Sequence, residues 1–138
     1  MIDKIYLDAS FFIAFKIPSH PFYKKALKIF DQIKNQQIYF SLFFIDEVIY
    51  NLSKYKLNKK QITDLVKKDL LEANNTFLLT LPPQKKIIEK YLKQWQKYNL
   101  KPIDSVHLFL MKQHKIKTIA TFDNHFIKNK KQLGINIL

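Results

Sequence analysis

Four acidic residues, widely separated along the chain, have the side chains and positions expected of a site for a divalent cation. They are Asp8, Glu47, Asp104 and Asp123. Asp8 directly follows a short apolar segment and Asp123 comes soon after another, and a buried carboxylate at such a position needs a metal, another cation or solvent. Carboxylate and water oxygens are the ligands that Mg²⁺ and Mn²⁺ prefer. We therefore expect these four residues to be both metal ligands and catalytic residues.

Each acid also has a plain structural explanation, and the sequence alone leaves both explanations open. Asp8 is a suitable N-cap for the segment after it, and Asp123 is suited to an Asx turn before the next helix. Asp104 stands in the first turn of a predicted helix, where the helix dipole favours an acid. Glu47 has an acidic neighbour, Asp46, but adjacent helical residues point about 100° apart, so that only one of them can face the site. We expect that residue to be Glu47.

The charge of the chain indicates a polyanionic partner. The formal net charge is +13, and all 24 basic residues are lysines. A surface this basic attracts nucleic acid, and a divalent cation held by the acids would supply the chemistry for hydrolysing a phosphodiester bond. We therefore expect a nucleic-acid substrate with Mg²⁺ or Mn²⁺ as cofactor. Lysine enrichment that serves solubility alone is the alternative.

The composition excludes several other kinds of site. The chain has no Cys, which excludes disulfides, thiolate-bound zinc and a cysteine nucleophile. Its one glycine, Gly134, excludes the glycine-rich loops that hold nucleotide phosphates. Three of the four histidines are expected to have core or surface roles: His20, His107 and His114. His125 differs because it adjoins Asp123 and Asn124, so we expect His125 and Asn124 to contact the metal ligands.

Length and hydropathy predict one cytoplasmic domain over residues 1–138. The chain is 47% hydrophobic and 14% aromatic, which suits a packed core and does not suit a disordered segment. Its N-terminal residues lack the features of a signal peptide, and its apolar runs are shorter than a membrane span. We expect no membrane partner.

The elements that must position the acids alternate between strands and helices. This alternation predicts a three-layer α/β/α sandwich with a mainly parallel central sheet of about five short strands. The predicted strands are Lys4 to Leu7, Ile38 to Phe40, Phe77 to Leu79, Thr118 to Ala120 and Ile135 to Ile137. Helices are predicted over Pro21 to Ile33, 58–75, 82–95, 102–111 and from about Phe126, and a helix buried on all sides is predicted over Leu42 to Tyr55. Along the helix over 82–95 the inner side is predicted to carry Ile87, Ile88, Tyr91, Leu92 and Trp95.

The four acids lie in short motifs whose order resembles that of the PIN-domain family. The motifs are Ile5-Tyr6-Leu7-Asp8-Ala9-Ser10, Ile45-Asp46-Glu47-Val48, Pro102-Ile103-Asp104-Ser105 and Ala120-Thr121-Phe122-Asp123-Asn124-His125-Phe126. Together they span nearly the whole chain, and the likeness is greatest to the small VapC-type toxins of toxin–antitoxin pairs. The resemblance implies a PIN-like fold and a divalent-metal endoribonuclease that acts on RNA. A metal-dependent DNA nuclease and a catalytically silent RNA-binding module remain open, because lysine–phosphate contacts serve either nucleic acid.

The resemblance also implies a role for individual residues. Asp8 and Asp104 match the family's core metal ligands, Glu47 matches its helix glutamate, and Asp123 matches the acid of its T-x-D segment. The hydroxyl residues Ser10 and Thr121 match groups that orient acids or waters. His125 is a departure, since many members have a further acid there.

The partners implied by the resemblance are a second copy of the chain and an antitoxin protein. Family toxins are typically paired dimers held by an antitoxin tail. We expect the aromatic residues within 11–15 and 43–44 to supply a groove for that tail.

Overall fold

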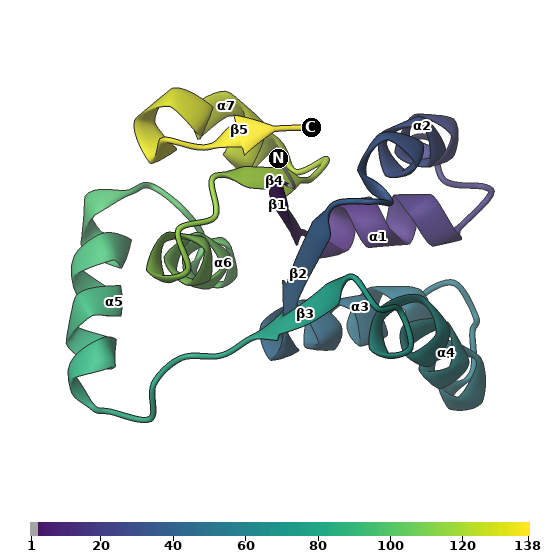
Figure 1. Cartoon of the computed structure of the whole chain (residues 1–138), viewed down its shortest axis with the longest axis horizontal. Coiled ribbons are helices and arrows are strands. Elements are labelled where there is room, and N and C mark those ends of the chain that lie inside the picture. The colour runs from purple at the N-terminus through teal and green to yellow at the C-terminus, as the bar shows by residue number, and fades with distance from the viewer. Residues whose placement is uncertain (1–2) are drawn as a thin grey trace.

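The computed structural model describes residues 3–138, in which five parallel strands form one sheet (Figure 1). The strands are β1 (Lys4–Leu7), β2 (Gln37–Ser41), β3 (Thr76–Leu79), β4 (Thr118–Ala120) and β5 (Asn136–Ile137). They lie in the order β3-β2-β1-β4-β5, which places β1 at the centre. Each predicted strand is present, two of them with the predicted bounds, and the parallel pairing confirms the predicted fold class.

Seven α-helices within the same residues cover the two faces of the sheet. They are α1 (Ala9–Lys16), α2 (Tyr23–Ile33), α3 (Leu42–Ser53), α4 (Lys59–Val66), α5 (Lys86–Lys97), α6 (Pro102–Gln113) and α7 (Asn124–Leu133). A short π-helical segment, Lys67–Leu71, continues α4. Figure 1 shows α1 to α4 on one side of the sheet and α5 to α7 on the other.

The alternation of side chains along β1 produces this three-layer arrangement. Successive strand residues point to opposite faces, so Ile5 and Leu7 pack in one apolar cluster, together with buried residues of α1 to α4. Tyr6 packs in a second cluster with residues of α6 and α7. The central strand therefore joins two cores, and its carboxyl end lies between them.

The strand order reverses between β1 and β4, and ligands of open α/β sheets bind in the crevice at such a point. Leu7 pairs with Ala120, and the backbone N–H of Asp8 donates to the carbonyl of Ala120 at 3.1 Å. The residues that follow the two strands are thereby held side by side. Asp8 and Thr121 stand at the start of this crevice.

Two helices, α3 and α6, begin close to this carboxyl edge of the sheet, and the residues at their N-termini explain where they start. Ser41 ends β2 and its hydroxyl accepts from the backbone N–H of Phe44 at 3.2 Å, which caps α3. Pro102 occupies the first turn of α6, where its missing N–H is not needed, and the carbonyl of Pro102 accepts from the Tyr91 hydroxyl of α5 at 3.0 Å. These starts place Asp104 in the first turn of α6 and Glu47 one turn into α3.

Three expectations about the helices were wrong. The helix α1 was not predicted, because its residues are apolar on all sides and show no helical period. The predicted burial of α3 on all sides fails, since Leu42 and Tyr50 are exposed and only one stripe of the helix is buried. On α5, Ile87 is buried but Ile88, Leu92 and Trp95 are exposed, so the inner side is narrower than the sequence indicated.

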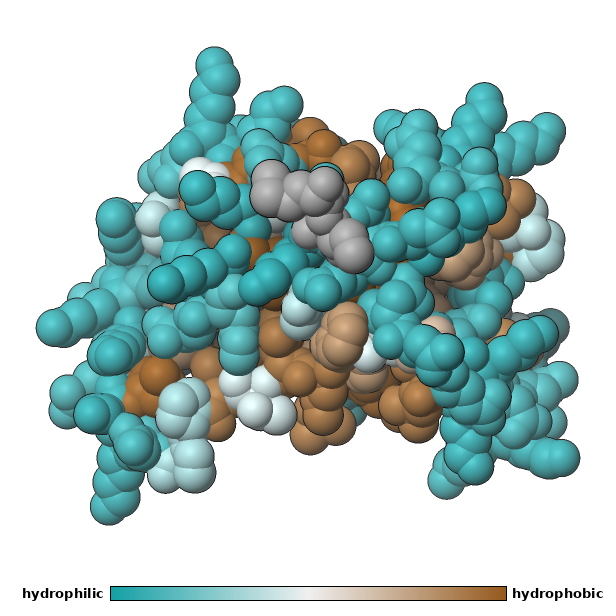
Figure 2. Space-filling view, in the orientation of Figure 1, coloured by the Kyte–Doolittle hydropathy of each residue, from teal (hydrophilic) through white to brown (hydrophobic). Residues whose placement is uncertain are grey.

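The aromatic residues expected to line an antitoxin groove lie mainly in the core. Phe11, Phe12 and Phe44 are buried, and Phe43 is exposed. Figure 2 shows exposed hydrophobic side chains instead around β3 and α3, with hydrophilic side chains over much of the remaining visible face. No helix among residues 3–138 is both long and apolar enough to cross a membrane.

Candidate metal centre

Asp8 stands in the N-cap position of α1, but its side chain does not cap the helix. Its Oδ2 atom instead accepts hydrogen bonds from the Ser10 hydroxyl at 2.6 Å and from the Thr121 hydroxyl at 2.7 Å. Burial raises the pKa of Asp8, and these two hydrogen bonds act in the opposite direction. The side chain of Asp8 therefore does not serve as the helix N-cap that the sequence also allowed.

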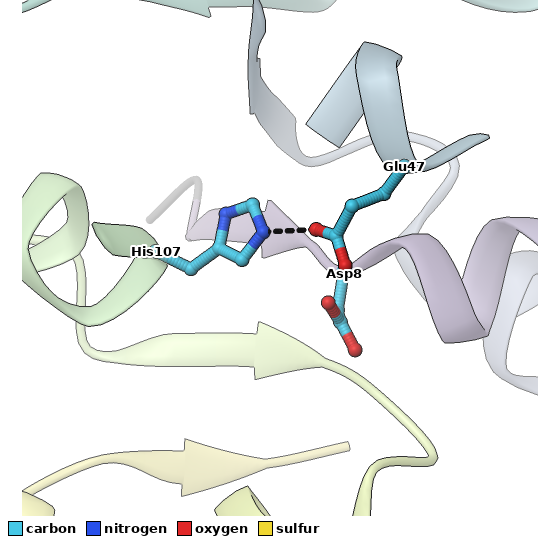
Figure 3. A group of neighbouring side chains, drawn as sticks. All are labelled: Asp8, Glu47 and His107. Carbon is cyan, nitrogen blue, oxygen red and sulfur yellow. Dashed lines mark hydrogen bonds and ion pairs between the residues drawn. The ribbon is translucent and has the colours of Figure 1, made fainter. Parts of the chain in front are cut away.

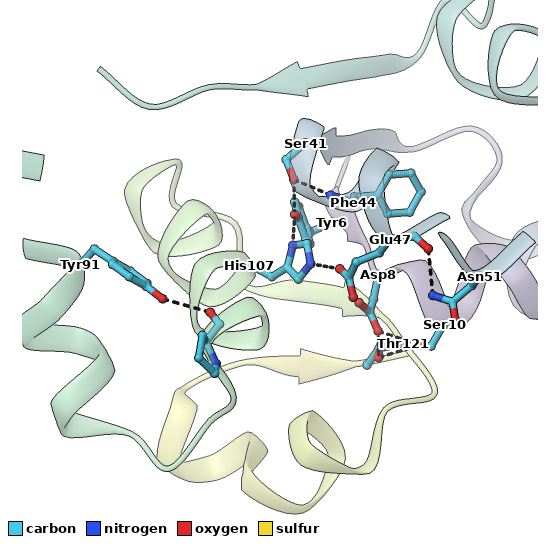
Figure 4. A network of polar contacts seen from close by, with 11 residues as sticks. Tyr6, Asp8, Ser10, Ser41, Phe44, Glu47, Asn51, Tyr91, His107 and Thr121 are labelled. Carbon is cyan, nitrogen blue, oxygen red and sulfur yellow. Dashed lines mark hydrogen bonds and ion pairs between the residues drawn. The ribbon is translucent and has the colours of Figure 1, made fainter. Parts of the chain in front are cut away.

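The two hydroxyl groups are themselves held by the backbone after β4. The N–H of Phe122 donates to Ser10 Oγ and the N–H of Asp123 donates to Thr121 Oγ1, both at 3.0 Å. Both hydroxyls can then direct their protons at Asp8 (Figure 4). The sequence placed Ser10 and Thr121 beside the acids, and the structure brings both of them to Asp8.

Asp104 is 4% exposed, and its Oδ2 atom has no hydrogen-bond partner among the described residues. Burial, followed by repulsion from Asp123 and Asp8, raises its pKa to about 6. A buried carboxylate oxygen without a donor is costly in a folded protein. A cation is the group that would satisfy it.

Asp123 does cap α7, since its side chain accepts from the backbone N–H of His125 at 2.9 Å. The same Oδ1 atom lies 3.0 Å from His125 Nδ1. Atoms of Asp104, Asp123 and His125 that could bind a metal all lie within 4.8 Å of one another. His125 is thus in contact with a predicted ligand, whereas Asn124 is exposed and makes no side-chain contact to the acids among the interactions recorded for residues 3–138.

Glu47 approaches from α3, and its Oε1 atom bonds to Nε2 of His107 on α6 (Figure 3). Asp8, Glu47 and His107 form a second group whose candidate ligand atoms lie within 4.8 Å of one another. The neighbouring Asp46 is exposed and does not line the pocket described below. The four predicted acids are therefore brought to one edge of the sheet, each from a different loop or helix.

Sequence reasoning missed His107, which is fully buried and continues a chain of hydrogen bonds into the core. A carboxylate only accepts, so His107 Nε2 donates to Glu47, and in the neutral ring Nδ1 accepts from the Tyr6 hydroxyl at 2.5 Å. Tyr6 in turn lies 2.9 Å from the Ser41 hydroxyl. Burial raises the pKa of Tyr6, which keeps it a donor. The available signal was the spacing of Asp104 and His107, since residues three apart share a helix face.

The donor set fits a divalent cation of the Mg²⁺ or Mn²⁺ kind. Carboxylate oxygens predominate, one of them is buried without a partner among residues 3–138, and burial together with repulsion from the other acids raises the pKa of Asp104. His107 has both ring nitrogens engaged, by Tyr6 and by Glu47, so it orients a ligand better than it serves as one. Asp8, Glu47, Asp104 and Asp123 are the residues that would hold the ion.

A cavity of about 420 Å³ opens beside these acids. Asp8, Glu47 and Asp123 line it together with Ser10, whereas Asp104 does not. Further lining comes from uncharged and basic side chains of three segments: His20, Phe22, Asn51, Lys54, Tyr55 and Phe122. Its volume lies within the range of roughly 300–1,000 Å³ that is usual for small-molecule and cofactor sites.

Comparison with protein families gives one match, to the family described as PIN domain, over residues 5–132. No curated protein matches the chain significantly.

Solved structures of the same fold include a toxin and a protein bound to DNA. The VapC20 toxin of Mycobacterium tuberculosis, which cleaves the sarcin–ricin loop, is 14% identical with a TM-score of 0.68, over 96% of each chain. FitAcB from Neisseria gonorrhoeae is 16% identical with a TM-score of 0.65, over 97% of this chain and 96% of that one. FitAB bound to an IR36 DNA fragment is 15% identical with a TM-score of 0.68, over 97% and 93%. At these identities the likeness concerns the fold.

We predict that Asp104→Asn stabilises the metal-free protein at pH 7.5. The raised pKa means that the fold favours the neutral carboxyl, so the ionised side chain present at this pH is destabilising, and the neutral isostere should add about 1–2 kcal/mol. Wild type should gain stability on addition of Mn²⁺, because the ion binds the folded state, and the variant should gain much less. Urea unfolding with EDTA and with Mn²⁺ measures both effects. Asp46→Asn is the matched control, and an Asp104→Asn protein that is less stable in EDTA would contradict the prediction.

We predict that His107→Ala weakens Mn²⁺ binding roughly 10- to 100-fold, because Glu47 loses the group that orients it. His107→Gln should recover part of this affinity, since its amide N–H can replace the Nε2 donor. Calorimetric titration of the folded variants gives the affinities. His114→Ala is the control. His114 follows the C-terminal end of α6, away from the site, where its ring contacts the carbonyl of Thr80. Equal affinity of wild type and His107→Ala would leave His107 with a packing role only.

Proposed function

The chain belongs to the PIN-domain family, and on that basis we propose that it is a divalent-metal-dependent endoribonuclease that hydrolyses phosphodiester bonds in RNA. The observation that carries this proposal is the convergence of four carboxylates at the carboxyl edge of the sheet, where one buried oxygen of Asp104 has no donor within the part of the chain that the structure describes. Helix capping alone does not require four acids in one place. A shared cation accounts for all four.

The proposed roles of the side chains follow from their contacts. Asp8, Glu47, Asp104 and Asp123 would hold the cation, which when bound supplies Lewis-acid activation of water and neutralises charge that develops on the phosphate. Ser10 and Thr121 fix Asp8, and His107 fixes Glu47, so that these two carboxylates need no rearrangement on binding. Lys54 in the cavity wall is placed to contact a phosphate.

We further propose that the protein is the toxin of a toxin–antitoxin pair, with an antitoxin and a second copy of the chain as partners. The fold likeness to the VapC20 toxin and to FitAcB supports this assignment. The surface offers apolar contacts suited to protein partners. A groove of about 390 Å³ between α3 and α4 is lined by apolar side chains that include Ile45, Ile49, Leu57, Ile62, Val66 and Leu71.

We predict that purified wild-type protein cleaves defined single-stranded RNA with Mg²⁺ or Mn²⁺, does not cleave it with EDTA, and does not cleave the matching DNA. Asp8→Asn should abolish cleavage while leaving RNA affinity within about twofold, because lysines elsewhere supply most phosphate contacts. Gel assays and fluorescence anisotropy measure the two quantities. Expression of wild type, but not of Asp8→Asn, should arrest bacterial growth if the chain is a toxin.

The same assay separates the alternatives. Cleavage of DNA but not RNA would assign the acids to a DNA nuclease. Tight RNA binding without cleavage in any metal would make the chain a catalytically silent binding module. Wild-type cleavage rates in the Asp8→Asn variant would show that the site is elsewhere.

We predict that the protein is a homodimer in which the exposed apolar residues at the start of α3 take part. Leu42 is 72% exposed and the adjacent Phe43 is also exposed, and neighbouring exposed apolar side chains mark surfaces that protein partners cover. Leu42→Lys should convert the dimer to a monomer in sedimentation velocity experiments, whereas Ile127→Lys on α7 should not. A wild-type sample that sediments as a monomer at all concentrations would contradict the dimer.

A further inference from the structure

Three phenylalanine rings form a near-parallel stack that runs from the core to the candidate site. Phe11 and Phe122 have ring centroids 5.9 Å apart, and Phe122 and Phe22 have centroids 4.9 Å apart, each pair with an interplanar angle of 22°. Phe11 is 1% exposed and Phe22 is 46% exposed. The stack therefore begins as buried packing and ends in a half-exposed ring.

The local structure does not require a phenylalanine at position 22. Phe22 is the N-cap residue of α2, makes no side-chain capping bond, and is of a residue type that caps poorly. A large aromatic ring that is exposed to solvent also contributes little to the stability of the fold. Its position is explained by its two neighbours, which are the Phe122 ring and the cavity beside the acids.

The ring is held in place before any ligand binds. The backbone N–H of Phe22 donates to His20 Nδ1 at 3.0 Å, and the N–H of Tyr23 donates to the His20 carbonyl at 3.0 Å. Pro18 and Pro21 restrict the backbone of the same loop. A pre-organised ring loses little conformational entropy when another ring stacks on it.

Phe22 and Phe122 line the same cavity as Asp8, Glu47 and Asp123. Phe122 is also adjacent in sequence to Asp123, and its backbone N–H holds Ser10, which in turn holds Asp8. The aromatic rings and three of the proposed metal ligands therefore line one cavity, and hydrogen bonds connect the Phe122 backbone to Asp8 through Ser10. A group that stacks on Phe22 lies next to a phosphate held at the acids.

The charge around the stack favours a nucleotide as the occupant. Lys25 stands one helical turn after Phe22, and its Nζ atom lies 5.7 Å from the centroid of the Phe122 ring. Lys24 and Lys28 are exposed on the same helix. Aromatic rings beside lysines are the combination by which proteins bind single-stranded nucleic acid, with bases on the rings and phosphates on the cations.

We propose that Phe22, backed by Phe122, offers its outer face as a stacking surface for one unpaired nucleobase that adjoins the scissile phosphate. This subsite rests on the proposed nuclease function and requires a base that is unpaired at the cleaved bond. A base in a duplex is stacked on both sides and cannot add to the phenylalanine stack.

The first experiment measures cleavage of a single-stranded RNA whose cleaved bond has been mapped. Removing the base on one side of that bond, by an abasic nucleotide, should lower kcat/KM of wild type roughly 10- to 100-fold, as expected for the loss of one base–aromatic stack. Phe22→Leu should cause a similar loss on intact RNA and no further loss on the abasic RNA, because both changes remove the same contact. Phe22→Tyr should stay close to wild type. Phe77→Leu is the matched control, since Phe77 is a half-exposed ring that packs on Tyr39 and does not line the cavity.

The second experiment measures binding in EDTA, where no cleavage is expected, with RNA that carries 2-aminopurine at the same position. Stacking quenches this fluorophore, so wild type and Phe77→Leu should quench it, and Phe22→Leu should quench it far less. Quenching that depends on Phe22 in a protein that cleaves nothing would support the subsite and overturn the nuclease function.

Three results would overturn the subsite. Metal-dependent cleavage unaffected by Phe22→Leu or by the abasic nucleotide would leave the nuclease function standing without this contact. Equal loss by Phe22→Leu on intact and abasic RNA would show that the ring contacts something other than the base. Phe22-dependent association with a protein partner, with no effect on RNA, would assign the ring to that partner.

Discussion

The burial of like-charged carboxylates at one edge of the sheet is the constraint on which the remaining features of the site depend. Burial and the neighbouring acids raise the pKa of Asp104, and burial raises that of Asp8. The fold offsets the cost of burying these charged groups by different amounts at different carboxylates. Asp8 receives two hydroxyl donors and Glu47 receives an imidazole donor, whereas the buried Oδ2 of Asp104 receives none among the described residues. The unevenness is itself informative, because a fold that needed no cation would gain stability by supplying the missing donor or by replacing the acid.

A series of hydrogen bonds runs from Glu47 into the core, so the position of Glu47 depends on how the core packs. The residues of this series are all buried: Ser41 at the end of β2, Tyr6 in β1 and His107 in α6. Ser41 is hydrogen-bonded to Tyr6, Tyr6 to His107, and His107 to Glu47. Because buried polar groups without partners are destabilising, removing one member affects all of them. The same side chains connect three elements whose relative positions decide where Glu47 points. The geometry of the site and the stability of the fold are therefore coupled through this series of hydrogen bonds.

The sequence predicted the sheet, the family and the placement of acids at the edge of the sheet because these depend on local patterns, whereas the metal-binding role of those acids stays a prediction. Short β-branched and aromatic runs mark the strands, and an acid soon after two of those runs marks the edge of the sheet. It did not predict α1, whose uniformly apolar residues show no period, or the role of His107, which depends on a contact to Glu47 sixty residues away. Exposure of Leu42 and Tyr50 on α3 was missed for a related reason. Hydropathy reports that a residue is apolar, but it does not report whether the fold leaves a partner to cover it.

The chain carries a net charge of +13 and brings four acids to one edge of its sheet, and under the proposed function the two kinds of charge would act on an RNA in opposite directions. Lysines attract phosphates over a long range without regard to sequence, while the acids repel the one phosphate that must reach them unless a cation is present. Neither charge selects which nucleotide is presented. An uncharged ring next to the acids avoids this conflict, because it neither repels the phosphate nor competes for the cation. Base recognition beside such a centre is therefore best performed by aromatic side chains, and Phe22 and Phe122 occupy that position in the wall of the cavity.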